Sequence, residues 1–321
     1  MQTSIFLTAR LLRKAHSRAR PNILRALPCV FLLGLLDTSF AYDAARHPVY
    51  ANQAVIAFRG CGYTLPASAA AALAAGTQDE DTAPLNLYDR STNWHFYNRE
   101  GRLRPWAFGN RSLDRIFAKR SQALEIALRG ESNINDVYHR AGQVLHYIQD
   151  MSVPAHVAPA FHMKLPLWDR SDPFDNFTAP VDSAPFALTS KQCSELSDQI
   201  TTDPVTATRL LANAAKRTLS AISPSVLEGQ TSDTDWRAYW IYPSDNHADA
   251  ANGWGAYGLC VFARRPQRSG CKTPRQEEAL FALQYQRTVT DSIRILIYLD
   301  KRRAKHPTTA FPPQQSLAGQ H

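Results

Sequence analysis

Two histidines and an aspartate stand close together in the otherwise apolar stretch GQVLHYIQDMSVPAH: His146, Asp150 and His156. The neighbouring apolar residues recur at three- and four-residue spacing, which is typical of an amphipathic helix. On a helix, His146 and Asp150 lie on one face, one turn apart, and can point at one cation. Imidazole and carboxylate are ligands of catalytic zinc, but the same spacing also suits a hydrogen-bonded His–Asp pair on a helix surface. The spacing alone leaves both interpretations open.

Other residues of the same chemistry strengthen the metal hypothesis. His95 lies between aromatic residues in WHFYN, where a half-buried imidazole needs a partner; a backbone carbonyl is the alternative to a metal. His162 follows His156 closely, and DPFDNF supplies Asp172 and Asp175. In DPFD, Asp172 suits a helix N-cap and Pro173 the first helical position, so Asp175 is expected to be free to project towards the histidines.

Residues 1–41 are expected to form a secretory signal peptide. A basic stretch precedes the apolar run ALPCVFLLGLL, which is too short to span a bilayer, and Ser39 and Ala41 suit a cleavage site. An uncleaved anchor and a start codon assigned too far upstream are the alternatives. Cleavage after Ala41 would give a secreted or periplasmic protein with a free amine at Tyr42, and His47 would lie five residues further on. The leader also carries +5 of the total charge of +8, so residues 42–321 carry only +3 and no nucleic-acid coat is implied.

The cysteines fit an oxidising compartment. Cys29 would leave with the leader, and an even number would remain: Cys61, Cys193, Cys260 and Cys271. Four cysteines allow three connectivities, and the short loop between Cys260 and Cys271 makes these two the first candidates for a disulfide. None of the four lies in a CxxC motif, so a cysteine zinc site is not expected.

The elements that must position these side chains are helical. Apolar periodicity predicts an all-α fold, a single multi-helix domain over residues 42–300, with helices near 49–58, 67–75, 113–128, 135–151, 205–222 and 276–299. Three segments between them are expected to be irregular: polar, turn-rich 76–104, a Pro- and Asp-rich loop to about 187, and a disulfide-tied insertion at 229–276. Residues 301–321 are expected to form a disordered basic tail.

Taken together, these motifs resemble the zinc-dependent phospholipase C and single-strand-specific nuclease superfamily. The resemblance rests on HFYN at His95, on HYIQDMSVPAH with its H-x3-D-x5-H spacing, and on the acidic DED at 79–81. It covers most of residues 42–180 and, more loosely, the last helix. It implies a secreted all-helical enzyme with a trinuclear zinc site.

The resemblance also implies the ligands of three zinc ions. Tyr42, through its amine and carbonyl, would share one ion with His47 and Asp150; Asp150 would bridge to a second ion held by Asp81, His95 and His146. His156, His162 and an acidic residue, Asp175 or Asp172, would hold the third. The family usually begins with tryptophan rather than Tyr42, and its second histidine of the third site usually comes later than His162.

The resemblance implies phosphodiester hydrolysis by a water that the paired zinc ions activate, with Asp81 orienting or deprotonating it. HFYN is closer to the phospholipase C branch, and the short Tyr42–His47 spacing is closer to the nuclease branch. The favoured expectation is a phospholipase C acting on a phospholipid headgroup during transient membrane-surface contact; the alternative substrate is single-stranded nucleic acid. A zinc-stabilised binding protein without turnover is a further alternative. No stable protein partner is implied.

The leader hypothesis makes a direct prediction about the mature chain. If the amine of Tyr42 is a metal ligand, the exported protein must begin at that residue. Sequencing the N-terminus of the exported protein is therefore expected to give Tyr-Asp-Ala-Ala-Arg. A mature chain that begins further upstream would remove Tyr42 from the ligand set.

Overall fold

The computed structural model describes residues 45–83, 95–99, 103, 112–130, 132–165, 168–178, 186–224, 235–245 and 252–305. The predicted leader, Tyr42 and residues 306–321 lie outside these ranges. Within them the chain is mainly helical, so the predicted all-α class is confirmed. No helix of the described part is both long and apolar enough to cross a bilayer.

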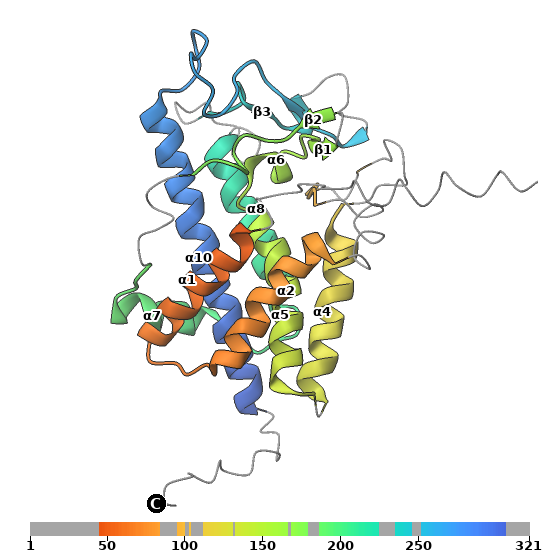
Figure 1. Ribbon diagram of the computed structural model, residues 1–321, viewed down its shortest axis with the longest axis vertical. Coiled ribbons are helices and arrows are strands. Elements are labelled where there is room, and N and C mark those ends of the chain that lie inside the picture. Colours follow the sequence, from red (N-terminus) through yellow and green to blue (C-terminus); the bar gives the residue numbers. More distant parts are fainter. Residues whose placement is uncertain are drawn as a thin grey trace, which may run out of the picture. The chain divides into compact units, whose positions relative to one another are not determined.

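Apart from α7, which was not predicted, the long helices follow the predicted order (Figure 1). Their bounds are α1 Arg46–Gly60, α2 Ala67–Thr82, α4 Asp114–Arg129, α5 Ile134–Asp150, α7 Ser190–Gln199, α8 Thr206–Ile222 and α10 Pro274–Lys305. Side-chain caps mark where two of these helices begin. Asn133 caps α5 by accepting from the backbone N–H of Asn135, and Thr189 and Gln192 form a reciprocal capping box at α7.

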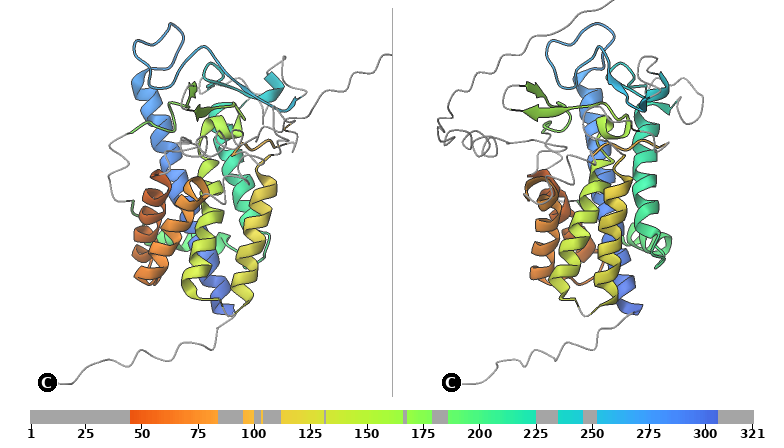
Figure 2. Two further views of the ribbon diagram at one scale, coloured as in Figure 1. Left: turned by 45° about the vertical axis from the view of Figure 1, so that its right-hand side comes forward. Right: turned by 90° about the vertical axis from the view of Figure 1, so that its right-hand side faces the viewer.

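The helices share one apolar core. The buried side of α10 alone contributes Phe281, Tyr285, Val289, Ile293 and Leu296 to it. Helix α10 packs against α1, α5 and α8, while α5 packs against α2 on one side and α4 on another. Both views in Figure 2 show α2 and α5 side by side along much of their length.

Two glycines allow the backbones of α2 and α5 to approach closely. A Cβ atom added at Gly142 of α5 would lie 2.2 Å from the carbonyl oxygen of Leu73 in α2. One added at Gly76 of α2 would lie 2.0 Å from the carbonyl oxygen of His139 in α5. This contact also explains a wrong prediction: residues 76–82 were expected in a turn-rich segment, but they continue α2, because packing against α5 outweighs the low helix propensity of Gly76.

The predicted Pro- and Asp-rich loop after α5 contains regular structure. Helix α6, Pro154–Val157, follows the Pro154 turn, and β1, Met163–Leu165, pairs antiparallel with β2, Trp168–Arg170. Figure 1 shows α6, β1 and β2 at the end of the bundle where α5 terminates.

The predicted irregular insertion is built into this same end of the bundle. Strand β3, Trp240–Ile241, is followed by the 3-10 turn η2, Pro243–Asp245, and pairs antiparallel with β4, Ala256–Tyr257. Its side chains Trp236, Trp240 and Phe262 belong to the main core. The segment is therefore short on regular structure but not a separate lobe.

Two disulfides tie the helices and this segment. Cys260 pairs with Cys271, which confirms the first candidate pair, and Cys61 at the end of α1 pairs with Cys193 in α7. Disulfides indicate an oxidising environment outside the cytosol.

Helix α10 extends further than predicted. Residues 301–305, assigned to the disordered tail, form its last turn. Lys301 Nζ donates to the carbonyl oxygens of Ser197 and Ile200, and Arg302 pairs with Glu125. These cations also lie at the negative end of the helix dipole, so their charge stabilises the turn that carries them.

The close crossing of α2 and α5 predicts a steric penalty. Gly142→Ala is expected to lower the free energy of unfolding by about 1–3 kcal/mol, because the new methyl must displace backbone rather than a flexible side chain. Denaturant unfolding would measure it. Gly60→Ala, where nothing lies within 4 Å of the added Cβ, is the control and should leave stability within about 0.5 kcal/mol or raise it. Equal effects of the two substitutions would contradict the packing argument.

Candidate metal centre

Five helix ends and turns bring the predicted histidines together. His47 lies in the first turn of α1, His146 in the last part of α5 and His156 in α6; His95 and His162 lie in the adjoining connections. All five are buried, none more than 5% exposed. The described residues contain three groups in which histidine and aspartate ligand atoms lie within 4.8 Å of one another: His47, Asp81 and His146; His95, His146 and Asp150; and His156, His162 and Asp175.

Asp150 joins the first two groups. Its Oδ1 lies 3.5 Å from His47 Nε2. Its Oδ2 lies 2.7 Å from His95 Nδ1 and 3.4 Å from His146 Nε2. The two oxygens of one carboxylate therefore face different histidines, which is the geometry that a bridging carboxylate requires. The i, i+4 placement of His146 and Asp150 on one helix face is confirmed.

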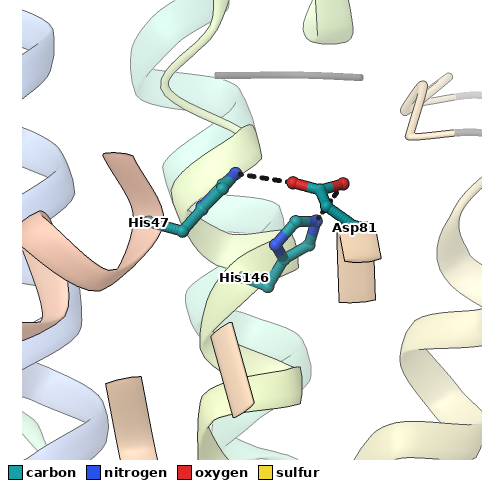
Figure 3. A group of neighbouring side chains, drawn as sticks. All are labelled: His47, Asp81 and His146. Carbon is teal, nitrogen blue, oxygen red and sulfur yellow. Dashed lines mark ion pairs between the residues drawn. The ribbon is translucent and has the colours of Figure 1, made fainter. Parts of the chain in front are cut away.

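Asp81 closes the same cluster from the end of α2 (Figure 3). Its Oδ2 lies 3.8 Å from His47 Nε2, and its Oδ1 lies 3.8 Å from His146 Nε2 and 3.9 Å from His95 Nε2. The resemblance placed Asp81 with His95, His146 and Asp150. The structure brings it equally close to His47, so that both carboxylates lie between the histidines.

These spacings suit tetrahedral metal coordination. Two ligand atoms bound to one ion at about 2.0–2.1 Å and a tetrahedral angle lie about 3.3 Å apart. His146 Nε2 lies 3.3 Å from His95 Nδ1 and 3.4 Å from Asp150 Oδ2. In the third group, His156 Nε2 and His162 Nε2 are also 3.3 Å apart, and His162 Nε2 lies 3.1 Å from Asp175 Oδ2. The three buried groups could therefore hold metal ions.

Two of the imidazoles are held by backbone carbonyls with Nε2 directed into the cluster. His146 Nδ1 lies 2.9 Å from the carbonyl oxygen of Thr77, and His162 Nδ1 lies 3.0 Å from that of Ala160. A carbonyl can only accept, so Nδ1 carries the proton and the Nε2 of the neutral ring has a lone pair. Such outer contacts orient histidine ligands in metal sites.

A series of hydrogen bonds between side chains orients the ring of His47 in the same way. Its Nδ1 lies 2.8 Å from Gln149 Oε1. Gln149 Nε2 donates to Ser292 Oγ at 3.2 Å, and the Ser292 hydroxyl donates to the carbonyl of Thr288 at 2.8 Å. Because that carbonyl accepts the serine hydrogen, Ser292 must accept from the Gln149 amide, and Gln149 Oε1 must accept from His47. The backbone of α10 thereby sets the tautomer of a histidine in α1.

The third group is held by HFYN, residues 95–98, which precede α4 in the chain. The N–H of Tyr97 donates to the carbonyl of His156, and Leu113 N–H donates to the carbonyl of Phe96, which holds HFYN against α6 and α4. The Phe96 ring packs edge-on against His162, with centroids 5.2 Å apart, and against Trp254 at the same distance. Its apolar contact excludes water from the histidine rings.

The carboxylates of Asp172 and Asp175 have different partners, as expected. Asp172 Oδ1 accepts from Phe174 N–H at 2.9 Å, and Oδ2 accepts from Trp240 Nε1 at 3.1 Å. Asp175 instead faces His162. Residues 173–176 form a turn rather than a helix, but Asp172 caps it in the predicted way.

The negative charges of the buried carboxylates in the cluster repel one another and are only poorly compensated by neighbouring side chains. Burial, and then the negative charges of Asp81, Asp175 and Glu80, raise the pKa of Asp150 well above its ordinary value. Burial, and then repulsion by His162, His95 and His47, lowers the pKa of His156 well below its ordinary value. Neutral imidazoles next to crowded carboxylates are the state in which both can bind a cation.

The other electrostatic shifts distinguish the members of the third group. Burial by itself lowers the pKa of His162, but Asp175, Asp172 and the carbonyl of Ala160 together outweigh burial, so the pKa is raised. Burial, followed by repulsion from Asp175, raises the pKa of Asp172 to about 6. The close contact with Asp175 therefore distinguishes His162 from His156, whose pKa is lowered.

The DED motif divides among three roles. Asp81 enters the cluster, whereas Asp79 pairs with His139 at 2.8 Å on a partly exposed surface. Glu80 is buried, pairs with Arg120 Nε at 2.8 Å and accepts from the Tyr147 hydroxyl at 2.6 Å. Glu80 thus anchors the end of α2 that carries Asp81.

The structure brings together all the predicted ligands that it describes; Tyr42 lies outside the described residues. Sequence reasoning missed Thr77, Ala160, Gln149 and Ser292. Two of these act through backbone carbonyls, which no residue type reveals. Gln149 had one signal, its place beside Asp150 and three residues after His146, but its partner Ser292 lies 143 positions away.

Comparisons with protein-family models, curated proteins and solved structures find no match. The superfamily resemblance therefore stays a prediction that rests on the sequence motifs.

The Gln149 contact predicts an effect on metal affinity. Gln149→Leu is expected to weaken metal binding by about 10–100-fold, because His47 loses the acceptor that orients its ring. Metal titration monitored by calorimetry would measure it. Gln284→Leu is a matched control: this glutamine is also fully buried, but its Oε1 accepts from Thr218. Both variants should lose stability, and only Gln149→Leu should lose metal affinity. Equal affinities would contradict the orienting role.

A second prediction separates the two carboxylates of the third group. Asp175→Ala is expected to lower the bound metal by about one equivalent, because Asp175 faces His162. Asp172→Ala should cost about 1 kcal/mol for the lost cap and about 1–3 kcal/mol for the Trp240 N–H left without its acceptor, and should retain the metal count. Elemental analysis of both folded variants would check this. Metal lost with Asp172 and kept without Asp175 would reverse the assignment.

Proposed function

We propose that this protein is a zinc-dependent phosphodiester hydrolase of the phospholipase C type. The observation that carries the proposal is the joined pair of His/Asp groups, in which Asp150 and Asp81 both lie between histidines, with a third group nearby. Imidazole and carboxylate donors at tetrahedral spacing suit zinc. A purely structural ion needs neither a shared carboxylate nor a second ion beside it.

The residues have distinct tasks in this proposal. His47, His146 and Asp150 hold the paired ions, with His95 completing the second set, and His156, His162 and Asp175 hold the third ion. Bound zinc supplies Lewis acidity and lowers the pKa of a bound water towards neutrality. Asp81, which lies 6% exposed at the end of α2, is the group placed to orient that water and accept its proton. Buried surroundings strengthen each of these electrostatic contacts.

The substrate proposal rests on the cavity beside the third group. A cavity of about 340 Å³ is lined on one side by Ser171, Asp172 and Pro173 and on the other by aromatic side chains, among them Phe161, Trp240 and Tyr257. A carboxylate among aromatic rings suits a cationic or apolar group better than an anion. A phosphodiester that carries a cationic or apolar substituent, as a phospholipid headgroup does, could place its phosphate at the three His/Asp groups and that substituent in this cavity.

Two other functions remain as alternatives. The same aromatic walls could stack a base, which favours a single-strand-specific nuclease. A zinc-stabilised binding protein without turnover would need the three metal groups but not Asp81 as a proton acceptor. Secretion, with Tyr42 as a ligand, belongs to the proposal as well.

The decisive test combines metal analysis with activity. The exported protein is expected to hold three zinc ions and to release the phosphorylated headgroup from phosphatidylcholine, with activity lost in chelator and restored by zinc.

Asp150→Asn should remove the paired ions together and reduce activity by several orders of magnitude. Asp79→Asn, in the exposed pair with His139, is the control and should keep metal and activity. Cleavage of single-stranded DNA in place of lipid would favour the nuclease. Full metal content and turnover in Asp150→Asn would reject the shared carboxylate.

A further inference from the structure

The segment from β4 to the start of α10 is a basic part of the described chain. Residues 250–276 contain Arg264, Arg265, Arg268, Lys272 and Arg275 and no aspartate or glutamate. Their charge of +5 exceeds the +3 of residues 42–321, so the rest of that range carries −2. This stretch is therefore locally basic, and the Cys260–Cys271 disulfide ties its residues 257–272 into one loop.

Part of this charge is used within the protein. Arg265 Nη2 lies 2.9 Å from Glu277 Oε2, and Lys272 Nζ lies 5.7 Å from the centre of the Trp236 ring. Arg264 and Arg268 are exposed at the outer part of the loop. Glu277 also accepts from Gln267 and from the backbone N–H of Ala263, so the base of the loop is held rigidly while two arginines are directed to solvent.

The same loop exposes an aliphatic side chain. Leu259 is 77% exposed, the largest value among the exposed large apolar side chains of the described residues, and Tyr257, two positions earlier, is 38% exposed. A leucine so exposed lies outside the core, and the next residue, Cys260, is held by the disulfide to Cys271. An exposed apolar side chain in a loop that also carries exposed arginines is a feature of surfaces that bind membranes.

The loop also forms part of the proposed substrate cavity. Tyr257, Cys260, Val261 and Phe262 line the cavity that contains Asp172, next to the third metal group. In Figure 1 the loop lies beyond the N-terminal end of α10, at the end of the bundle that carries α6, β1 and β2. A surface bound by the loop would therefore lie next to the cavity.

We infer that the disulfide-closed loop around Leu259, Arg264 and Arg268 docks the protein on an anionic lipid bilayer. This inference rests on the proposed function, since it supplies the surface from which a phospholipid would enter the cavity. The arginines match anionic headgroups, and their stems and Leu259 can enter the apolar boundary. Single-stranded nucleic acid would use the same cations, but Leu259 can neither stack on a base nor donate a hydrogen bond, which favours lipid.

The test measures binding and hydrolysis separately in the same samples. The exported protein is sedimented with vesicles of phosphatidylcholine alone or mixed with phosphatidylglycerol, and the released headgroup is quantified. Tighter binding to the anionic vesicles is expected. Arg264→Gln with Arg268→Gln should weaken that binding about 25-fold, about fivefold for each arginine. Leu259→Ser should weaken binding to both vesicle types by about tenfold.

Matched substitutions on α4 are the controls. Ile126, 65% exposed, is the counterpart of Leu259, and Arg115 with Arg129 is the counterpart of the arginine pair. Ile126→Ser and Arg115→Gln with Arg129→Gln should bind vesicles as the unmodified protein does. All these positions are exposed, so the variants are expected to fold.

The outcomes separate the two proposals. Loop-dependent binding without headgroup release would support the docking inference and reject the hydrolase. Headgroup release, together with vesicle binding that the loop variants do not alter, would support the hydrolase and reject the docking inference. Equal loss in loop and control variants, or no preference for anionic vesicles, would overturn the docking inference. Loop-dependent binding to a single-stranded oligonucleotide but not to vesicles would overturn it in favour of nucleic acid.

Discussion

A fully buried carboxylate at the end of a helix is the constraint around which this structure is arranged. Asp150 is the last residue of α5, where the helix dipole places negative charge, and it is 0% exposed. A second buried carboxylate, Asp81, lies in the same cluster. An isolated buried charge costs several kcal/mol, so this position is tolerable only with compensating cations or protons. The imidazoles of His47, His95 and His146, held at metal-ligand spacing, provide the means to bind such cations.

The glycine contact between α2 and α5 serves this cluster directly. Because Gly76 and Gly142 let the two backbones touch, the carbonyl of Thr77 comes within 2.9 Å of His146 Nδ1. One helical turn further along α2, Asp81 reaches the same histidine from its other nitrogen. Packing and chemistry are thus coupled: a wider helix separation would lose both the acceptor that orients His146 and the carboxylate that faces it.

The segment that carries the disulfide Cys260–Cys271 connects the metal groups to the protein surface. Trp240 donates to Asp172, which leaves Asp175 as the acid facing His162. The amide side chain of Asn98 donates to the carbonyl of Gly253, which holds this segment against HFYN. A part of the chain with little regular structure therefore shapes the cavity next to the third group, while the helices hold the ligands.

The sequence by itself indicated most of the long helices, the first candidate disulfide and the histidines and aspartates that the structure brings together. Apolar periodicity is local, H-x3-D needs only the helical repeat, and the capping role of Asp172 depends on residues within one turn. Tertiary structure decided what local patterns cannot encode: that residues 76–82 continue α2, that Asp81 faces His47 as well as His146, and that Gln149, Ser292 and two backbone carbonyls orient the histidines. Those contacts join positions far apart in the chain, and a backbone carbonyl has no residue type to signal it. Their partners are defined only when the helices pack.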